Sequence, residues 1–386
     1  MKRIFIAVIT ISLLVIFCST SFAANDDSLF DIEAHFLDLS TVSHDKVQET
    51  AELLASMPNL EEVELGTQAD REGESVLTFE DIEILMDATP QADFNYQFSL
   101  FDRTVNLSDE ELDLNHIKMH DEGELVRQAV SCMKHLRYLC MDTCNVSNES
   151  MEKIRDDFPD VDVVWRIWFG KTYSVRTDVE KILASKPSQG GVLYDSKLEV
   201  LKYCTKVKYL DLGHNDVITD ISFVNYMPDL EVCILAMNKL GDISPLSNCK
   251  KLEYLELFYS DGLTDLSPLS ELENLRHLNV GMCNNLKDIS PLYDLDLDRL
   301  YIGCITPIPV EQIEKYRELH PDCDIDDYSW DTSIGSWRYT TDFDDDPEYL
   351  ACDYYRQGMH PRFALLREQF GYDSLAYSFM WLDPNY

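Results

Sequence analysis

Residues 252–260 read Leu-Glu-Tyr-Leu-Glu-Leu-Phe-Tyr-Ser, and this stretch decides the fold. Counted from Leu252 as offset 0, apolar residues stand at offsets 0, 3 and 5, and a small polar residue stands at offset 8. The same spacing begins at Val207, Leu230 and Leu275, and in degraded form at Leu297, so it recurs every 22 or 23 residues. A fixed period of this length indicates a repeat architecture in which each copy is one coil of a solenoid.

A second recurring block follows the strand in four copies of the repeat, and we call it the closing block. It reads Asp-Ile-Ser-Pro-Leu at 242–246 and 288–292, Asp-Leu-Ser-Pro-Leu at 265–269, and Asp-Ile-Ser at 220–222. Ser or Asp can cap a short helical turn, and Pro suits its first position. The block therefore predicts one short helical turn in each coil, after the strand.

Together the two blocks resemble the leucine-rich repeat family, in particular the short bacterial type of internalin-like surface proteins. The match extends over roughly residues 204–305. The resemblance implies an α/β leucine-rich repeat solenoid, with a curved parallel sheet on its concave side and helices or short helical turns on its convex side. It also implies recognition of a protein through that concave sheet.

Looser copies precede residue 204. Residues 60–65 and 136–144 carry the strand spacing, and residues 37–39 and 112–114 are shorter strand fragments. A helix followed by a strand is predicted at 151–163 and again at 313–325, and more faintly around Pro58 and Pro90. These longer coils resemble ribonuclease-inhibitor-like repeats. We expect one continuous solenoid, with a separate N-terminal domain ending at Gly190-Gly191 as the alternative.

Both ends of the chain differ from the repeats. Residues 1–23 have a basic start, an apolar run and small residues before Ala24, which predicts a signal peptide cut before Ala24 and a secreted or cell-surface protein. Cys18 raises a lipoprotein alternative, which the bulky Phe17 disfavours. No second long apolar segment follows, so no transmembrane segment is expected in the mature chain.

The expected organisation of the chain has four parts. They are a signal peptide (1–23), degenerate longer repeats (24–203), regular repeats (204–309) and a C-terminal cap with an acidic aromatic tail (310–386).

The charge of the chain excludes some classes of partner. It has 71 acidic and 32 basic side chains and a formal net charge of −39. Such a surface neither neutralises phosphates nor docks onto anionic lipid, so we expect no nucleic-acid partner. Calcium could act as a surface counterion, although the acidic run at 322–327 lacks the Gly and Glu of a calcium loop.

Neither a metal site nor a catalytic site is predicted. His116 and His120 have an i, i+4 spacing, but the Leu-Asp-Leu upstream indicates a strand and no Glu follows the first His. Cys233, at offset 3, and Cys144 and Cys283, at offset 8, occupy inward positions, so we expect most cysteines to be free thiols. No catalytic motif is present, and no cofactor is expected.

The concave face is the candidate site. If offsets 3 and 5 point into the core, then offsets 2, 4 and 6 point to solvent. The predicted binding residues at these offsets are Tyr138, Tyr209, Asp211, Val232, Ile234, Tyr254, Glu256, Phe258, His277, Asn279, Arg299 and Tyr301. Exposed aromatic residues beside apolar and acidic ones are typical of a protein-recognition surface, and the predicted function is binding without catalysis. The alternative is a carbohydrate-active or other hydrolytic enzyme whose chemistry lies in the acidic aromatic region around Trp330 to Asp353.

Overall fold

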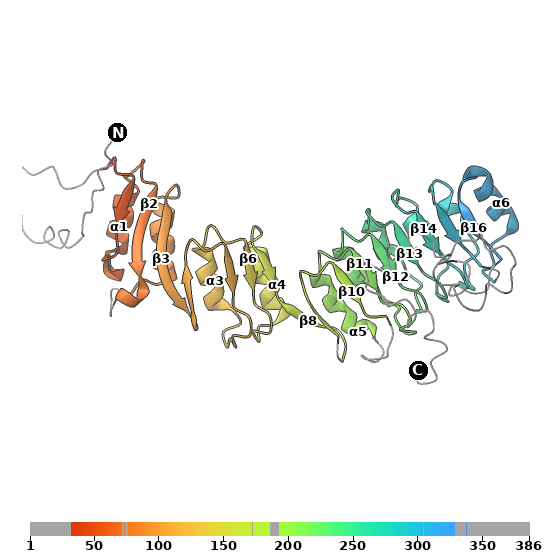
Figure 1. Cartoon of the computed structure of the whole chain (residues 1–386), viewed down its shortest axis with the longest axis horizontal. Coiled ribbons are helices and arrows are strands. Elements are labelled where there is room, and N and C mark those ends of the chain that lie inside the picture. Colours follow the sequence, from red (N-terminus) through yellow and green to blue (C-terminus); the bar gives the residue numbers. More distant parts are fainter. Residues whose placement is uncertain are drawn as a thin grey trace, which may run out of the picture. The chain divides into compact units, whose positions relative to one another are not determined.

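The computed structural model describes residues 32–328, apart from 72, 74–75, 172, 186–192 and 304, together with Trp337. The predicted signal peptide, Cys18 and the rest of the acidic aromatic tail lie outside the described residues. The chain divides into two compact units, Met1–Trp165 and Arg166–Tyr386, which we call the N-terminal and the C-terminal unit (Figure 1). No helix among the described residues is long and apolar enough to cross a membrane.

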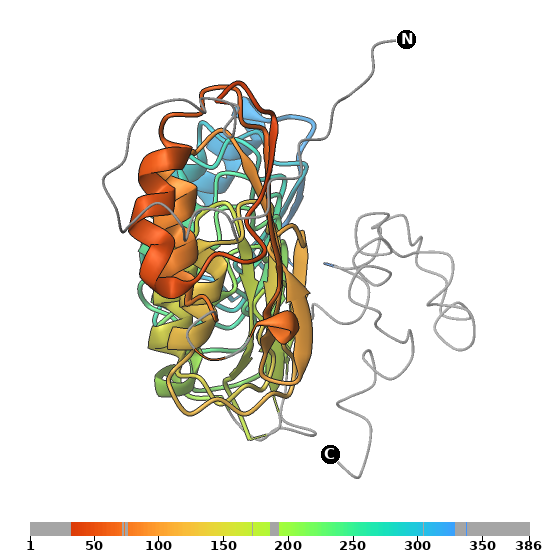
Figure 2. The same cartoon turned by 90° about the vertical axis from the view of Figure 1, so that its left-hand side faces the viewer.

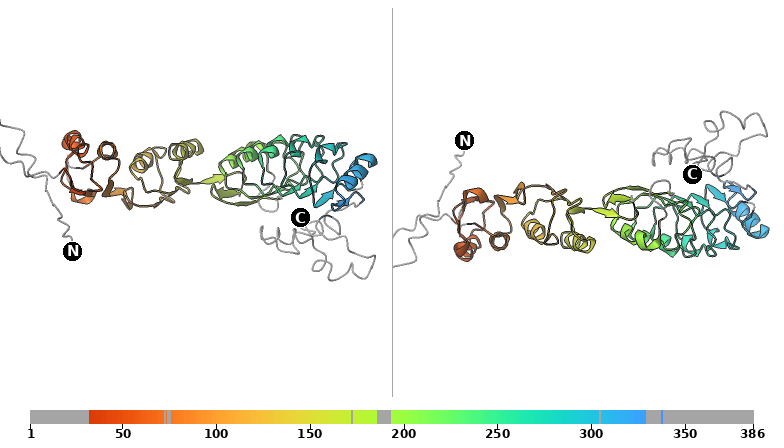
Figure 3. Two further views of the ribbon diagram at one scale, coloured as in Figure 1. Left: turned by 90° about the horizontal axis from the view of Figure 1, so that it is seen from above. Right: turned by 90° about the horizontal axis from the view of Figure 1, so that it is seen from below.

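The C-terminal unit is built on one parallel sheet of seven strands. Its strands are β10 (Lys181–Leu183), β11 (Tyr209–Asp211), β12 (Val232–Ile234), β13 (Tyr254–Glu256), β14 (His277–Asn279), β15 (Arg299–Tyr301) and β16 (Asp324–Asp326). Equivalent offsets pair across neighbouring strands, as in Leu255 with Leu278. Successive coils stack side by side (Figure 3). The last strand, β16, comes from the region predicted as a cap and extends the sheet by one more strand.

Short 3-10 helices close the coils at the predicted block. They are η6 (Ser222–Tyr226), η7 (Ser244–Asn248), η8 (Ser267–Leu269) and η9 (Ser290–Leu292), and the last three carry Pro at their start. Longer helical segments stand at the two ends of the unit: α5 (Asp195–Leu198) with η5 (Glu199–Tyr203), and α6 (Val310–Leu319). A parallel sheet joined by such turns is the leucine-rich repeat fold, as predicted.

The aspartate of each closing block organises its turn. The carboxylates of Asp242, Asp265 and Asp288 each accept a hydrogen bond of 2.8 Å from the backbone N–H of the serine two residues on. These bonds, with the serine hydroxyl groups, lower the pKa of all three carboxyl groups below the usual value. The closing block is thus stabilised by the ionised form of its aspartate.

Acid is expected to loosen these turns. Because the pKa of each carboxyl is lower in the folded state, its contribution to stability is present above the unfolded pKa of about 4 and is lost as pH falls through the folded value. Replacing all three with Asn keeps the acceptor oxygen but removes the titration, so the variant should lose less stability than the wild type between pH 5 and pH 2. Urea denaturation at several pH values measures this. Identical pH profiles would contradict the assignment.

The core of the C-terminal unit is a stack of equivalent side chains. Leu210, Cys233, Leu255, Leu278 and Leu300 occupy offset 3 on five adjacent strands, and none is exposed to solvent. At offset 8, Asn238 and Cys283 donate to carbonyl groups of their own and the preceding coil. Each coil therefore depends on its neighbours for burial and for hydrogen bonds.

None of the eight described cysteines forms a disulfide with another described cysteine. Burial raises the pKa of the Cys249 and Cys283 thiols to about 12, so both remain protonated at neutral pH. Cys304 and Cys352 lie outside the described residues.

The N-terminal unit has helical coils, as predicted from residues 151–163 and around Pro58 and Pro90. Its helices are α1 (Val47–Leu54), α2 (Phe79–Ala88), α3 (Glu124–Ser131) and α4 (Asn148–Asp157), with short 3-10 helices η2 (His44–Lys46) and η3 (Gln68–Asp70). Figure 2 shows α1 and α2 on one side of the strands of this unit. The strands form two sheets: β1 (Phe36–Asp38), β2 (Glu62–Thr67), β3 (Asp93–Leu100) and β4 (Arg103–Asn106), then β5 (Glu111–Asp113), β6 (Tyr138–Cys140) and β7 (Asp162–Val164).

The parallel ladder is interrupted within the N-terminal unit, and the expectation of one continuous solenoid stays a prediction. Strand β4 runs antiparallel to β3, so the first parallel ladder ends there. A second antiparallel pair, β8 (Arg166–Trp168) with β9 (Ser174–Arg176), begins the C-terminal unit ahead of β10. A hairpin reverses the strand direction, which a stack of parallel coils cannot accommodate without a break. The predicted alternative boundary at Gly190-Gly191 lies outside the described residues, and the repeat-length classes remain predictions.

Candidate functional site: the outer face of the C-terminal sheet

Most of the predicted binding residues share one surface. The side chains at offsets 2 and 4 of β10–β16 lie on the face of the sheet opposite the leucine stack, and we call this surface the sheet face. In register, Tyr209, Val232, Tyr254, His277 and Arg299 are neighbours on adjacent strands. The other predicted residues of this unit are Asp211, Ile234, Glu256, Asn279 and Tyr301 on the same strands, and Phe258, which packs against them.

Tyr138 does not belong to this surface. It lies on β6, in the three-stranded sheet of the N-terminal unit. The repeat offset placed Tyr138 correctly on a strand, but the offset carries no information about which sheet the strand joins.

The predicted exposure of the sheet face is wrong. Nine of the twelve predicted residues are no more than 7% exposed: Asp211, Val232, Ile234, Tyr254, Glu256, His277, Asn279, Arg299 and Tyr301. Tyr209 and Phe258 are only half-buried. Part of this burial comes from a large aromatic side chain of the C-terminal tail, Trp337, which packs against Tyr254 and Tyr301 and is itself 2% exposed.

Trp337 occupies a pocket formed by several strands. Its ring centroid is 5.5 Å from that of Tyr254 and 6.2 Å from that of Tyr301. Val232, Ile234 and Ala236 belong to the same apolar cluster, with Tyr209 and Phe258 at its margin. The indole N–H donates a hydrogen bond of 2.8 Å to Oε1 of Glu256. We call this site the indole pocket.

Two charged side chains frame the indole pocket. Glu256, 1% exposed, also accepts a hydrogen bond from the Tyr254 hydroxyl. The guanidinium of Arg299 lies 5.8 Å from the centroid of the Trp337 ring, and its Nε is 3.3 Å from a carboxylate oxygen of Asp324. Burial lowers the pKa of Arg299, and the charges of Asp324 and Asp326 oppose that shift. An arginine remains protonated under these conditions, so the pocket offers an acceptor, a cation and aromatic walls.

Sequence reasoning missed two residues of this site. Trp337 lies within the region predicted only as an acidic aromatic tail, and Gly281 is absent from the predicted binding residues. Gly281 stands at offset 6, where the preceding coil has Phe258, and the ring of Tyr301 lies directly against it. The signal was available, since a glycine where a neighbouring coil carries an aromatic residue indicates a close approach of another side chain.

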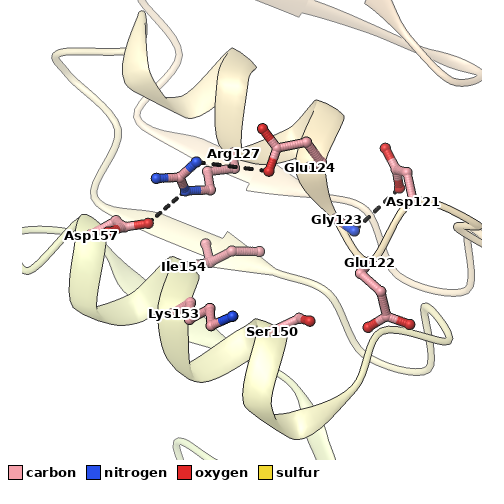
Figure 4. A pocket seen from close by; sticks show the side chains of 9 residues that line it. All are labelled: Asp121, Glu122, Gly123, Glu124, Arg127, Ser150, Lys153, Ile154 and Asp157. Carbon is pink, nitrogen blue, oxygen red and sulfur yellow. Dashed lines mark hydrogen bonds and ion pairs between the residues drawn. The ribbon is translucent and has the colours of Figure 1, made fainter.

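Another hollow lies between α3 and α4 in the N-terminal unit (Figure 4). Two of its acidic side chains already have partners within the fold: Glu122 accepts a hydrogen bond from the backbone N–H of Ser147, and Asp157 pairs with Arg127 at 2.5 Å.

His116 and His120 are exposed, and neither lies in a helix. Among the described residues, no group of three or more His, Cys, Asp or Glu side chains could hold a metal ion. The alternative catalytic region, Trp330 to Asp353, lies outside the described residues except for Trp337.

Comparison with known proteins places this geometry among solved leucine-rich repeat structures. No family model and no curated protein matches the sequence. An internalin from Listeria monocytogenes is similar at 20% identity over 72% of this chain, with a TM-score of 0.35, and the match spans 64% of that internalin's length. A leucine-rich repeat protein from Leptospira interrogans is similar at 20% identity, with 71% of this chain and 74% of that chain covered and a TM-score of 0.32. Likenesses of this degree carry no argument about partners.

Proposed function

We propose that this is an exported, non-catalytic binding protein that recognises a protein partner through the sheet face of its C-terminal unit. The observation that supports the proposal is the indole pocket. It combines aromatic walls with a carboxylate acceptor and a cation, and it holds a tryptophan side chain. Tryptophan, tyrosine and arginine are the residues that dominate binding energy at protein interfaces.

The charge of the chain adds an expectation about the partner. With a net charge of −39, the protein favours partners that carry basic patches. Attraction of this kind acts over about 8 Å at physiological salt, so the association rate should fall as salt is added. Export rests on residues 1–23 alone, and mass spectrometry of the protein from its native source should find Ala24 at the amino terminus.

The proposal is tested with a random peptide library. Peptides of 15 residues are selected on the full chain and, separately, on its Trp337→Ala variant. The affinity of the selected peptides is then measured for the Tyr254→Ser and Phe258→Ser variants and compared with that for the wild type. We expect selected peptides to lose at least tenfold in affinity for these two variants, because each removes an aromatic contact at the sheet face.

The matched control is Tyr226→Ser, which removes an exposed tyrosine from η6. It should leave peptide binding unchanged. Circular dichroism and thermal unfolding establish that each variant is folded. If the selected peptides bind the folded sheet-face variants as well as the wild type, the sheet face is not the recognition surface.

A further inference from the structure

The walls of the indole pocket belong to the repeats, whereas its occupant does not. Val232 lies on β12, Tyr254 on β13 and Tyr301 on β15, and all three strands are held in register by the parallel ladder. Trp337 lies 81 residues beyond Glu256, after the last strand of the sheet. The coils therefore form the pocket from their own pairing, and Trp337 enters it as a separate segment.

Glu256 makes the pocket selective for one kind of side chain. A buried carboxylate is stable only when hydrogen-bond donors satisfy it, and Oε1 of Glu256 accepts from both the Tyr254 hydroxyl and the Trp337 indole N–H. Phenylalanine would fill the aromatic space but offers no donor. Tryptophan combines the large flat ring with an N–H, so it matches both the walls and the acceptor.

Arg299 adds to this selectivity. Its guanidinium lies 5.8 Å from the indole centroid, within the range of a cation–π interaction, and tryptophan is the best acceptor for such a contact. The pocket thus presents three separate features that an indole satisfies together: aromatic walls, a buried acceptor and a cation.

We propose that the indole pocket is the anchor site for a tryptophan on the protein partner, and that Trp337 is an internal ligand which the partner must displace. This inference rests on the proposed function and specifies the chemistry of the partner. A tethered side chain has an effective concentration of the order of millimolar, so Trp337 weakens the apparent affinity of any competing segment. In the sequence Trp337 is followed by Arg338, the only basic residue between 322 and 353. The chain's own segment is therefore a suitable probe.

The probe is a synthetic peptide with the sequence of residues 333–341, Ser-Ile-Gly-Ser-Trp-Arg-Tyr-Thr-Thr. We expect it to bind the full chain carrying Trp337→Ala at least tenfold more tightly than the wild type, because only the variant has an empty pocket. A control peptide with Ala in place of Trp should not bind. A peptide with 1-methyltryptophan keeps the ring but cannot donate to Glu256, and should bind about tenfold or more weakly than the parent peptide.

A measurement on the wild type keeps the proposal testable if Trp337→Ala does not fold. Biosynthetic 5-fluorotryptophan gives a fluorine resonance for each tryptophan, and Trp337 is assigned through Trp337→Phe. Peptides from the library selection should move the Trp337 resonance toward the position of a solvent-exposed indole, while the resonances of Trp165 and Trp168 stay in place.

Two outcomes would overturn the inference. Library peptides that bind the wild type and Trp337→Ala equally well, and leave the Trp337 resonance unmoved, would show that the partner does not enter the pocket, and the proposed function would stand. If the self-peptide binds Trp337→Ala while no library peptide depends on the sheet face, the pocket holds only the chain's own tail, and the proposed function falls with the inference.

Discussion

Replacing Asn238 with alanine is expected to lower the free energy of unfolding of the C-terminal unit by about 2 kcal/mol. The Asn238 side chain is 2% exposed, and its amide donates to the carbonyl groups of Leu212 and Leu235, each at 3.0 Å. The Leu212 carbonyl also accepts from Asn215, so it retains a donor in the variant. The Leu235 carbonyl loses this side-chain donor, and the missing amide leaves a gap between two coils.

The matched control for Asn238→Ala is Asn238→Cys. The repeat itself carries a cysteine at the equivalent offset, where Sγ of Cys283 lies 3.4 Å from the carbonyl oxygen of Leu257 and 3.7 Å from that of Gly281. A thiol is a weak donor of nearly the right size, so Asn238→Cys should cost about half as much as Asn238→Ala. Urea denaturation, followed by hydrogen exchange of the amides in β12 and β13, measures both losses. Equal losses would show that the ladder position needs only volume and no donor.

The repeat fold could be predicted because its signals are local. Leu255 and its equivalents recur at a fixed spacing, and each strand buries the same side, so the sequence alone determines which side chains form the core. The short helical turn after each strand could also be predicted, because Asp, Ser and Pro each have a specific role at the start of such a turn. The helix-plus-strand coils of the N-terminal unit were found through their spacing around Pro58 and Pro90 for the same reason.

The hairpin between β3 and β4 could not be predicted. The turn between β3 and β4 contains Phe101, with a φ of 56°, followed by Asp102. A left-handed conformation at this point is usually indicated by Asn-Gly or Asp-Gly, and this turn has neither. Hydrophobic alternation is the same for parallel and antiparallel strands, so nothing in residues 93–106 indicated the change of direction.

The occupied state of the sheet face could not be predicted either. The offsets placed Tyr254, Glu256 and Tyr301 on the correct face, but exposure depends on what else lies there. The contact between Glu256 and Trp337 joins residues 81 apart, and Trp337 belongs to no repeat from whose period its partner could be inferred. The acidic composition of the C-terminal tail favours a solvated segment. At Trp337 this tendency is outweighed by the hydrogen bond from the indole N–H to the buried carboxylate of Glu256.

Gly281→Ala is expected to damage the indole pocket without disturbing the sheet. A Cβ atom at position 281 would lie 2.6 Å from Cδ1 of Tyr301 and 3.2 Å from the Phe258 ring, both closer than ordinary contact. Tyr301 has no exposed surface, and its ring centroid is 6.2 Å from that of Trp337, so a displaced Tyr301 ring is expected to disturb the indole pocket. Overpacking of this kind costs about 1–3 kcal/mol. It should also weaken binding of the 333–341 peptide to the Trp337→Ala background about tenfold or more.

Gly213→Ala is the matched control, because Gly213 occupies the same offset three coils earlier. Its amide donates to the carboxylate of Asp211 just as the amide of Gly281 donates to the side-chain oxygen of Asn279. A Cβ atom there would come no closer than 3.2 Å to any neighbour, whereas at position 281 it would lie 2.6 Å from a ring carbon of Tyr301. The next coil already carries Ala236 at the offset of Gly213. Gly213→Ala should therefore keep both stability and peptide affinity near the wild-type values. If both glycine variants bind the peptide equally well, the Tyr301 ring does not form the wall that the indole pocket requires, and tryptophan recognition would have to depend on Tyr254 and Glu256 alone.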